Sequence, residues 1–322
     1  MNNILVTGIG GNVGYGILRN IRHSFSDIRL IGTNTSYLSA GNHFCDEVYE
    51  VPFSTDNTYM PVMIELCAKH NIDLIIPSTD YETYILAVHA DKLPPIAVSP
   101  SGTTKIFLDK YLSYQALSSF GLAFAESILP SAYDNRFEKY ILKPREGRGS
   151  RNLFYNPSNP ERFSDDYIVQ PMLEGIEITT AFYVTMQNEL HGLITLERQL
   201  ASGATNICEV NQAHDKELEQ YIRTLISKIE IRGACNLQSI VTADGTIVPF
   251  EVNCRISGTN SIRSQFGFKD VSYTVDEYLY NKQPEKPVIT TGSAVRMLSD
   301  IIYHGTSLKD ITNNADKFYI YE

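Results

Sequence analysis

Residues 249–255 read Pro-Phe-Glu-Val-Asn-Cys-Arg, and they form the most informative segment of this chain. Polar and apolar residues alternate as in a strand, so Glu251, Asn253 and Arg255 are expected to share one face. The preceding strand of a predicted hairpin adds the amide of Gln238. A carboxylate and two amides offer the oxygen ligands that suit Mg²⁺. The alternative is a polar face that only meets solvent.

A basic, glycine-rich loop lies about a hundred residues upstream. Lys143 closes a short predicted strand, and residues 145–151 read Arg-Glu-Gly-Arg-Gly-Ser-Arg. The backbone N–H groups of Gly147, Gly149 and Ser150 are suited to wrap phosphate oxygens beside the Lys143 ammonium. No Walker A pattern occurs, and a solvated basic hairpin is the alternative interpretation.

The first hundred residues alternate short apolar strands with helical patterns, which predicts a parallel sheet. Residues 8–14, Gly-Ile-Gly-Gly-Asn-Val-Gly, join the first strand to the first helix. A dinucleotide site expects GxGxxG and an acid after the second strand, but the spacing here is GxGxxxG and Asn34 stands near that position. The glycines therefore indicate either a cofactor site or only a tight turn.

Composition narrows the class of protein. The 322 residues carry 27 Lys+Arg and 37 Asp+Glu, a net charge of −10, which disfavours nucleic-acid binding. Five cysteines without CxxC spacing argue against a disulfide framework and a zinc knuckle. Neither a signal peptide nor an apolar run of about 18 residues is present, so we expect a cytoplasmic protein without a membrane partner.

Several segments, in the same order, resemble the ATP-grasp superfamily. They are Asp-Lys at 109–110, Ile-Leu-Lys-Pro at 141–144 and the hinge-like segment 168–177. Residues 251–258 match the E-x-N-x-R-x-S-G pattern of the branch that includes the carbamoyl phosphate synthase large subunit, and Gln238 replaces an acid as in that branch. The chain is long enough for a single grasp unit.

This resemblance implies an α/β and α+β architecture. A pre-ATP-grasp domain with a parallel sheet is expected at residues 1–100. A small lid subdomain is expected at 101–173, and a C-terminal subdomain with the metal site at 174–322. Pro171 and Cys254 depart from the family pattern, because Glu and Pro are usual there.

The resemblance also implies roles for individual residues. The nucleotide, ATP, would be held by Lys110, Lys143, Gly147, Gly149, Ser150, Gln170, Met172, Leu173 and Glu177. Gln238, Glu251 and Asn253 would hold Mg²⁺, with Mn²⁺ as an alternative. The catalytic residues would be Arg255, Arg198 and Lys143. Arg263 is assigned to a substrate carboxylate, with a surface salt bridge as the alternative.

The implied activity is ATP-dependent ligation of a small-molecule carboxylate to an amine through an acyl phosphate, with release of ADP and phosphate. A second hypothesis is an NAD-dependent oxidoreductase or epimerase that uses the glycine-rich turn, although the Tyr-x-x-x-Lys spacing occurs only at 278–282. A third is an ATP-binding module without turnover. The sequence leaves the oligomeric state open, a homodimer included.

Overall fold

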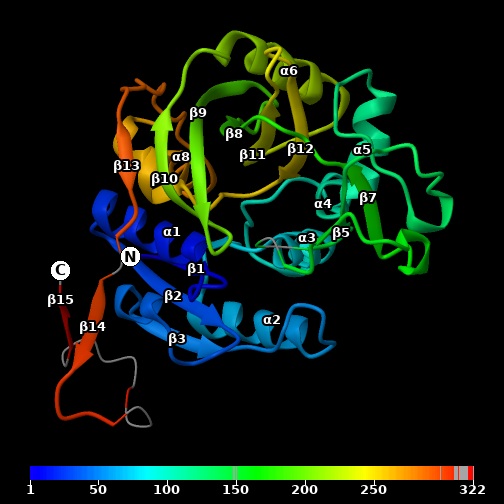
Figure 1. Cartoon of the computed structure of the whole chain (residues 1–322). Helices are drawn as coiled ribbons and strands as arrows, with labels where there is room; N and C mark the ends of the chain where they lie inside the picture. The colour runs from blue at the N-terminus through cyan, green and yellow to red at the C-terminus, as the bar shows by residue number, and fades with distance from the viewer. Residues whose placement is uncertain (148, 150, 298, 308–310, 312–317, 322) are drawn as a thin grey trace.

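The N-terminal part of the chain forms a parallel sheet. The computed structural model describes residues 1–147, 149, 151–297, 299–307, 311 and 318–321. The sheet has the strand order β3 (Glu47–Glu50), β2 (Ile28–Asn34), β1 (Asn2–Val6), β4 (Leu74–Ile76). Helices α1 (Asn12–Ser24), α2 (Tyr59–His70) and α3 (Asp80–Val88) complete this unit (Figure 1). Beyond β4 the sheet continues only as a single parallel bridge between Ile75 and Ile96.

The middle of the chain begins with two helices, α4 (Ser101–Leu108) and α5 (Lys110–Ser119). They are separated at Asp109, whose carboxylate caps α5 by accepting from the backbone N–H groups of Tyr111 (2.9 Å) and Leu112 (3.3 Å). A small antiparallel sheet follows, with the order β6 (Phe154–Tyr155), β5 (Tyr140–Pro144), β7 (Tyr167–Pro171). It carries Lys143 and Gln170 on neighbouring strands.

The last part is built on a six-stranded antiparallel sheet. Its order is β12 (Ile247–Asn253), β11 (Gly233–Val241), β8 (Ile176–Val184), β9 (Leu190–Ala201), β10 (Ala204–Val210), β13 (Ser293–Val295). The other elements are α6 (Asp215–Lys228), α7 (Asn260–Arg263), α8 (Asp270–Tyr278), β14 (Asp300–Tyr303) and β15 (Phe318–Tyr321). A parallel sheet followed by an antiparallel one confirms the expected mixed α/β fold class.

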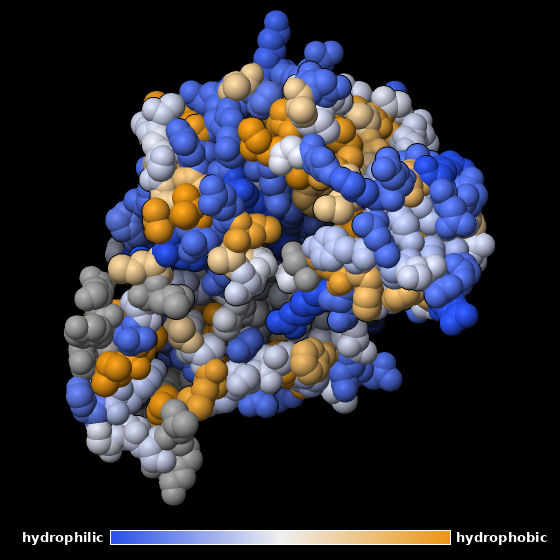
Figure 2. Space-filling model, viewed as in Figure 1, coloured by the Kyte–Doolittle hydropathy of each residue, from blue (hydrophilic) through white to orange (hydrophobic). Residues whose placement is uncertain are grey.

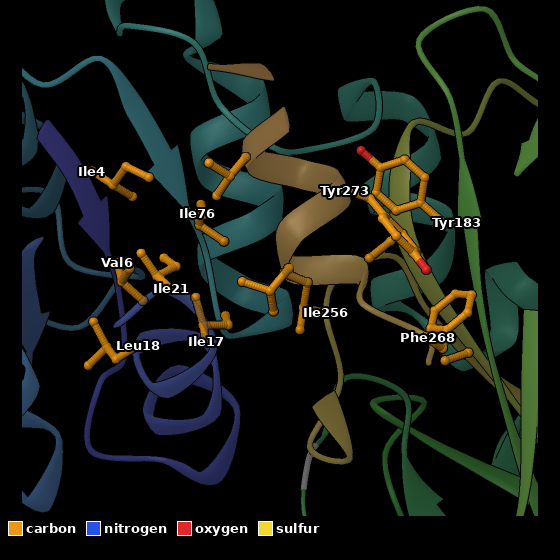
Figure 3. Packing of buried hydrophobic residues seen from close by; sticks show 14 of the residues in the cluster. Ile4, Val6, Ile17, Leu18, Ile21, Ile76, Tyr183, Ile256, Phe268 and Tyr273 are labelled. Atoms are coloured by element: carbon orange, nitrogen blue, oxygen red, sulfur yellow. The ribbon is translucent and has the colours of Figure 1, made fainter. Parts of the chain in front are cut away.

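One hydrophobic cluster joins the N-terminal sheet to the antiparallel part. Ile4 and Ile17 belong to the same buried cluster as Ile256, Phe268 and Tyr273 (Figure 3). The cluster therefore crosses from the first unit to residues more than two hundred positions away.

Polar contacts reinforce this junction. The Asn260 side-chain amide donates to the Val13 carbonyl (3.1 Å), and Asn20 donates to the Asn260 side-chain oxygen (3.1 Å). A Cβ at Gly16 would lie only 2.3 Å from that same oxygen. Glycine is therefore required where α1 meets Asn260.

The glycine-rich turn is also closely packed. Gly8 has a φ of +59°, and a Cβ at Gly14 would lie 2.5 Å from the Gly8 carbonyl oxygen. This contact is with backbone, which cannot move aside as a flexible side chain would. Both glycines thus have a structural reason that involves no ligand.

We expect Gly14→Ala to lower the free energy of unfolding by about 1–3 kcal/mol, because the added methyl overpacks the turn. The matched control is Gly102→Ala in α4, where nothing lies within 4 Å of the new Cβ. That change should be neutral or stabilise by up to about 1 kcal/mol. Urea unfolding followed by circular dichroism measures both, and equal effects would contradict the packing argument.

The five cysteines are free and buried. None of the helices in the described part of the chain has the length and apolarity needed to cross a membrane.

Candidate functional site

A cavity of about 820 Å³ lies where the three sheets meet. The face shown in Figure 2 is hollowed between its upper and lower parts. Most of the residues selected from sequence line this cavity: Lys110, Lys143, Gly147, Gly149, Gln170, Met172, Leu173, Glu177, Arg198, Gln238, Glu251, Asn253 and Arg255. Ser150 lies outside the described residues.

The predicted metal ligands form one connected group. Gln238 and Glu251 are register partners on β11 and β12. The Gln238 amide donates to Asn253 Oδ1 (3.1 Å), and the Asn253 amide donates to Glu251 Oε1 (3.3 Å). No cluster of three or more His, Cys, Asp or Glu occurs among the described residues, so a cation here would need the amide oxygens. The all-oxygen donor set, with one carboxylate, fits a hard divalent cation such as Mg²⁺.

Two lysines lie close to this oxygen cluster. Lys110 Nζ lies 3.4 Å from Glu251 Oε1 and donates to the Gly147 carbonyl (3.2 Å), which ties the glycine-rich loop to the β11–β12 hairpin. Lys143 Nζ lies 5.2 Å from the centre of the Phe250 ring. Two ammonium groups facing one carboxylate leave a local excess of positive charge, which suits a polyanion.

This crowding shifts the pKa values of the site. Burial, and then repulsion by Lys110, lowers the pKa of Lys143 to about 7. Burial alone would raise the pKa of Glu251, but Lys110 and Lys143 outweigh it and hold that pKa below its usual value. Glu251 is therefore ionised near neutral pH, where Lys143 changes its protonation state.

Arg198 is anchored at the edge of the oxygen cluster. Its Nη2 donates to Glu177 Oε1 (2.5 Å) and to Gln238 Oε1 (2.7 Å), and its Nε donates to Glu177 Oε1 (3.0 Å). Glu177, the predicted ribose acceptor, thus holds Arg198. The structure brings these residues together at the wall that also carries the metal-ligand candidates.

The predicted adenine-binding edge has partners that the sequence did not reveal. The Gln170 side chain is buried and donates to Ser127 Oγ (3.0 Å). The backbone N–H of Met172 donates to the Lys139 carbonyl (3.0 Å). Gln170 therefore holds the segment around Ser127, and the Met172 N–H already has a hydrogen-bond acceptor.

Arg263 does not have the place that we predicted. Its side chain is fully buried, does not line the cavity and pairs with Asp270 Oδ2. Its Nη1 also donates to Ser257 Oγ (2.8 Å) and Thr259 Oγ1 (2.7 Å). The prediction of Arg263 as a substrate ligand is therefore wrong, because its guanidinium is consumed by structural contacts. The pair with Asp270 is also buried rather than on the surface.

Arg296, which the sequence did not single out, lines the cavity instead. It follows β13, a strand that the sequence did not predict, and it donates to the carbonyls of Gly258 (2.8 Å) and Thr205 (2.9 Å). Burial lowers the pKa of its guanidinium from the ordinary value. Periodicity gave no signal for so short an edge strand.

The N-terminal unit supplies the opposite end of the cavity. The lining residues there are Gly8, Gly11, Asn12, Val13, Asn34, Thr35, Phe53, Ser54, Ser78, Thr79, Asp80 and Glu82. Asp80 reaches across and accepts from Arg255 Nη2 (2.7 Å). The only sequence signal for Asp80 is its position after β4, at the carboxyl edge of a parallel sheet, where ligands commonly bind.

Two family models match consecutive parts of the chain, and the boundary between the two matches lies between residues 100 and 107. Residues 4–100 match the family described as PylC-like, N-terminal domain, and residues 107–259 match the ATP-grasp domain family. No curated protein matches the chain.

Solved structures share this fold at low sequence identity. The biotin carboxylase domain dimer of Hydrogenobacter thermophilus 2-oxoglutarate carboxylase, complexed with MgADP, ADP and bicarbonate, has a TM-score of 0.73 and 12% identity, covering 93% of this chain and 74% of its own. N5-carboxyaminoimidazole synthetase from Staphylococcus aureus, complexed with ADP, has a TM-score of 0.71 and 11% identity. The match covers 94% of this chain and 82% of the synthetase. L-amino acid ligase from Bacillus licheniformis has a TM-score of 0.69 and 12% identity. The match covers 90% of this chain and 75% of the ligase.

Proposed function

The chain carries an ATP-grasp domain behind a PylC-like N-terminal domain, and from this premise we propose that it is an ATP-dependent carboxylate–amine ligase. The proposal depends on one observation, which is that two lysines and the candidate metal ligands line the same cavity. There Lys110 and Lys143 face the connected oxygens of Gln238, Glu251 and Asn253. The similar folds in complex with ADP, and the L-amino acid ligase, support it.

The side chains suit nucleotide phosphates between the lysines and the glycine-rich loop. Lys110 and Lys143 bind phosphate oxygens, while Gly147 and Gly149 offer backbone N–H groups. Leu173 and its neighbours contact the adenine. Glu177 gives up its hydrogen bonds with Arg198 and accepts from the ribose hydroxyls instead. Gln238, Glu251 and Asn253 would hold Mg²⁺, which when bound neutralises charge on the phosphates.

The reaction then needs mainly positioning. The substrate carboxylate attacks the γ-phosphorus in line, its new O–P bond replaces the bond to ADP, and ADP leaves. Arg255 stabilises the charge on the transferring group. The amine next attacks the acyl carbon, phosphate leaves and the nitrogen loses a proton. Exclusion of water by the loop protects the acyl phosphate from hydrolysis.

We assign the amine to the N-terminal end of the cavity. The charged residues contributed there by residues 1–100 of the described chain are Asp80 and Glu82, both acidic. Asn12 and Asn34 add neutral donors and acceptors. This lining suits an amine without a phosphate group. The packing reasons found for Gly14 and Gly16 weaken the alternative of a dinucleotide enzyme.

An ADP-release assay with Mg²⁺ and pairs of carboxylates and amines tests the proposal. We expect ADP release that depends on both a carboxylate and an amine. ATP binding without release for any pair would favour a non-catalytic module. NAD binding without ATP affinity would favour an oxidoreductase and refute the ligase.

ATP binding is expected to take up a proton at and above pH 7. The free protein has a Lys143 pKa of about 7, and nearby phosphates raise it because they stabilise the ammonium form. Affinity should therefore fall as pH rises above 7. Isothermal titration in two buffers of different ionisation enthalpy measures the uptake. Lys143→Met should abolish it, whereas Lys139→Met, an exposed control four residues earlier, should not.

A further inference from the structure

Arg255 is only partly engaged by the protein. Its Nη2 donates to Asp80 Oδ2 (2.7 Å) and its Nη1 to the Ile256 carbonyl (3.1 Å). Its Nε is buried and finds no partner among the described residues. A buried donor left unpaired is costly, so this N–H is suited to an acceptor on a ligand in the cavity.

Asp80 comes from the other structural unit. It is the first residue of α3, directly after Thr79, whose hydroxyl caps that helix by accepting from the Glu82 N–H (3.3 Å). The ion pair with Arg255 joins residues 175 positions apart. Side-chain exposures of 12% for Arg255 and 19% for Asp80 mean that solvent screens the pair weakly.

Arg255 also lies next to the predicted metal ligands. Burial acts to raise the pKa of Glu251, and Arg255 acts against this in the same direction as Lys110 and Lys143, which have the larger effects. The guanidinium is thus bonded to an aspartate of the N-terminal unit, and its charge also acts on the carboxylate proposed to hold Mg²⁺. A ligand oxygen that met Nε would lie in the region assigned to the transferring phosphoryl group.

We propose that Asp80 is a positioning residue, which holds the Arg255 guanidinium so that its Nε–H stays available to the γ-phosphate. The inference rests on the proposed function of this site. A guanidinium is planar, so two fixed contacts restrict its rotation and reduce the ordering needed when the phosphate binds. The N-terminal unit thereby contributes to phosphoryl transfer without touching the nucleotide.

Titration calorimetry with Mg²⁺ and two nucleotides tests this role. Adenosine 5′-(β,γ-imido)triphosphate has a γ-phosphate, whereas ADP does not. We expect Asp80→Ala to weaken binding of the imido triphosphate by roughly five- to tenfold and to leave ADP binding within about twofold. Asp80→Asn keeps an acceptor oxygen, so its loss should be intermediate. Asp46→Asn, which breaks an aspartate–arginine pair away from the cavity, should change neither.

The Arg255→Ala background shows whether Asp80 acts through Arg255. There, Asp80→Ala should cause no further loss, because the group it positions is absent. Additive losses, equal losses for both nucleotides, or tighter triphosphate binding after removal of the Asp80 charge would each overturn the inference while leaving the proposed function intact. A wild-type protein that binds neither nucleotide would overturn both. Circular dichroism confirms that each variant is folded.

Discussion

Glu251→Gln should reduce ligase turnover by about 10²- to 10³-fold, the scale seen when one charge-stabilising group is lost from an active site. The substitution keeps the shape of the side chain and its contact with Asn253 but removes the only carboxylate of the proposed metal set. It also removes the charge that faces Lys110 at 3.4 Å. Steady-state ADP release, measured over a range of Mg²⁺ concentrations, should show a higher Mg²⁺ requirement.

Glu209→Gln is the matched control for this change. Glu209 lies on β10 with an exposed side chain and does not line the cavity. Its substitution should leave turnover and Mg²⁺ dependence unchanged. If Glu251→Gln retained wild-type turnover, the assignment of the oxygen cluster to the metal would be wrong.

Arg263→Met should lower the free energy of unfolding by about 3–5 kcal/mol, because it leaves the Asp270 carboxylate buried without its counter-charge. Both side chains are essentially inaccessible, at 0% and 1% exposure. The double variant Arg263→Met with Asp270→Asn should recover part of the loss, since the unpaired charge is then gone. Chemical denaturation of the single and double variants measures these differences.

Arg223→Met is the comparison for a solvent-exposed pair. Arg223 and Glu219 form an i, i+4 ion pair on α6 at 57% and 47% exposure, so its loss should cost only about 0.3–0.5 kcal/mol. An Arg263→Met protein of normal stability with a raised KM for the carboxylate would restore the substrate role that the structure contradicts.

The strongest sequence predictions were those based on period-two alternation. The alternation in 249–255 correctly indicated a strand, and the pairing of Gln238 with Glu251 followed from a tight hairpin. The Asp-Lys pair singled out at 109–110 lies at the start of α5, where the Asp109 carboxylate caps the helix. The assigned roles of the site residues and the three-part division of the chain stay predictions.

Side-chain contacts between residues far apart in the sequence could not be predicted from the local pattern of polar and apolar residues. The Asp80–Arg255 pair joins two units, and periodicity does not report which sheet edges meet. Arg263 was expected to bind a substrate carboxylate or to form a surface salt bridge, but it is buried and paired with Asp270. Short β13 and the side-chain contacts of Gln170 were missed because neither leaves a periodic signal.

The continuous hydrophobic cluster has a consequence for building chimaeras. Since Ile4 and Ile17 pack in one cluster with Ile256 and Phe268, exchanging the N-terminal unit between relatives at residue 100 alone would mismatch the inner surface of the graft (Figure 3). A functional hybrid would need residues 256–279 from the same parent. Natural recombination at that single boundary would meet the same obstacle, so these distant segments should be inherited together.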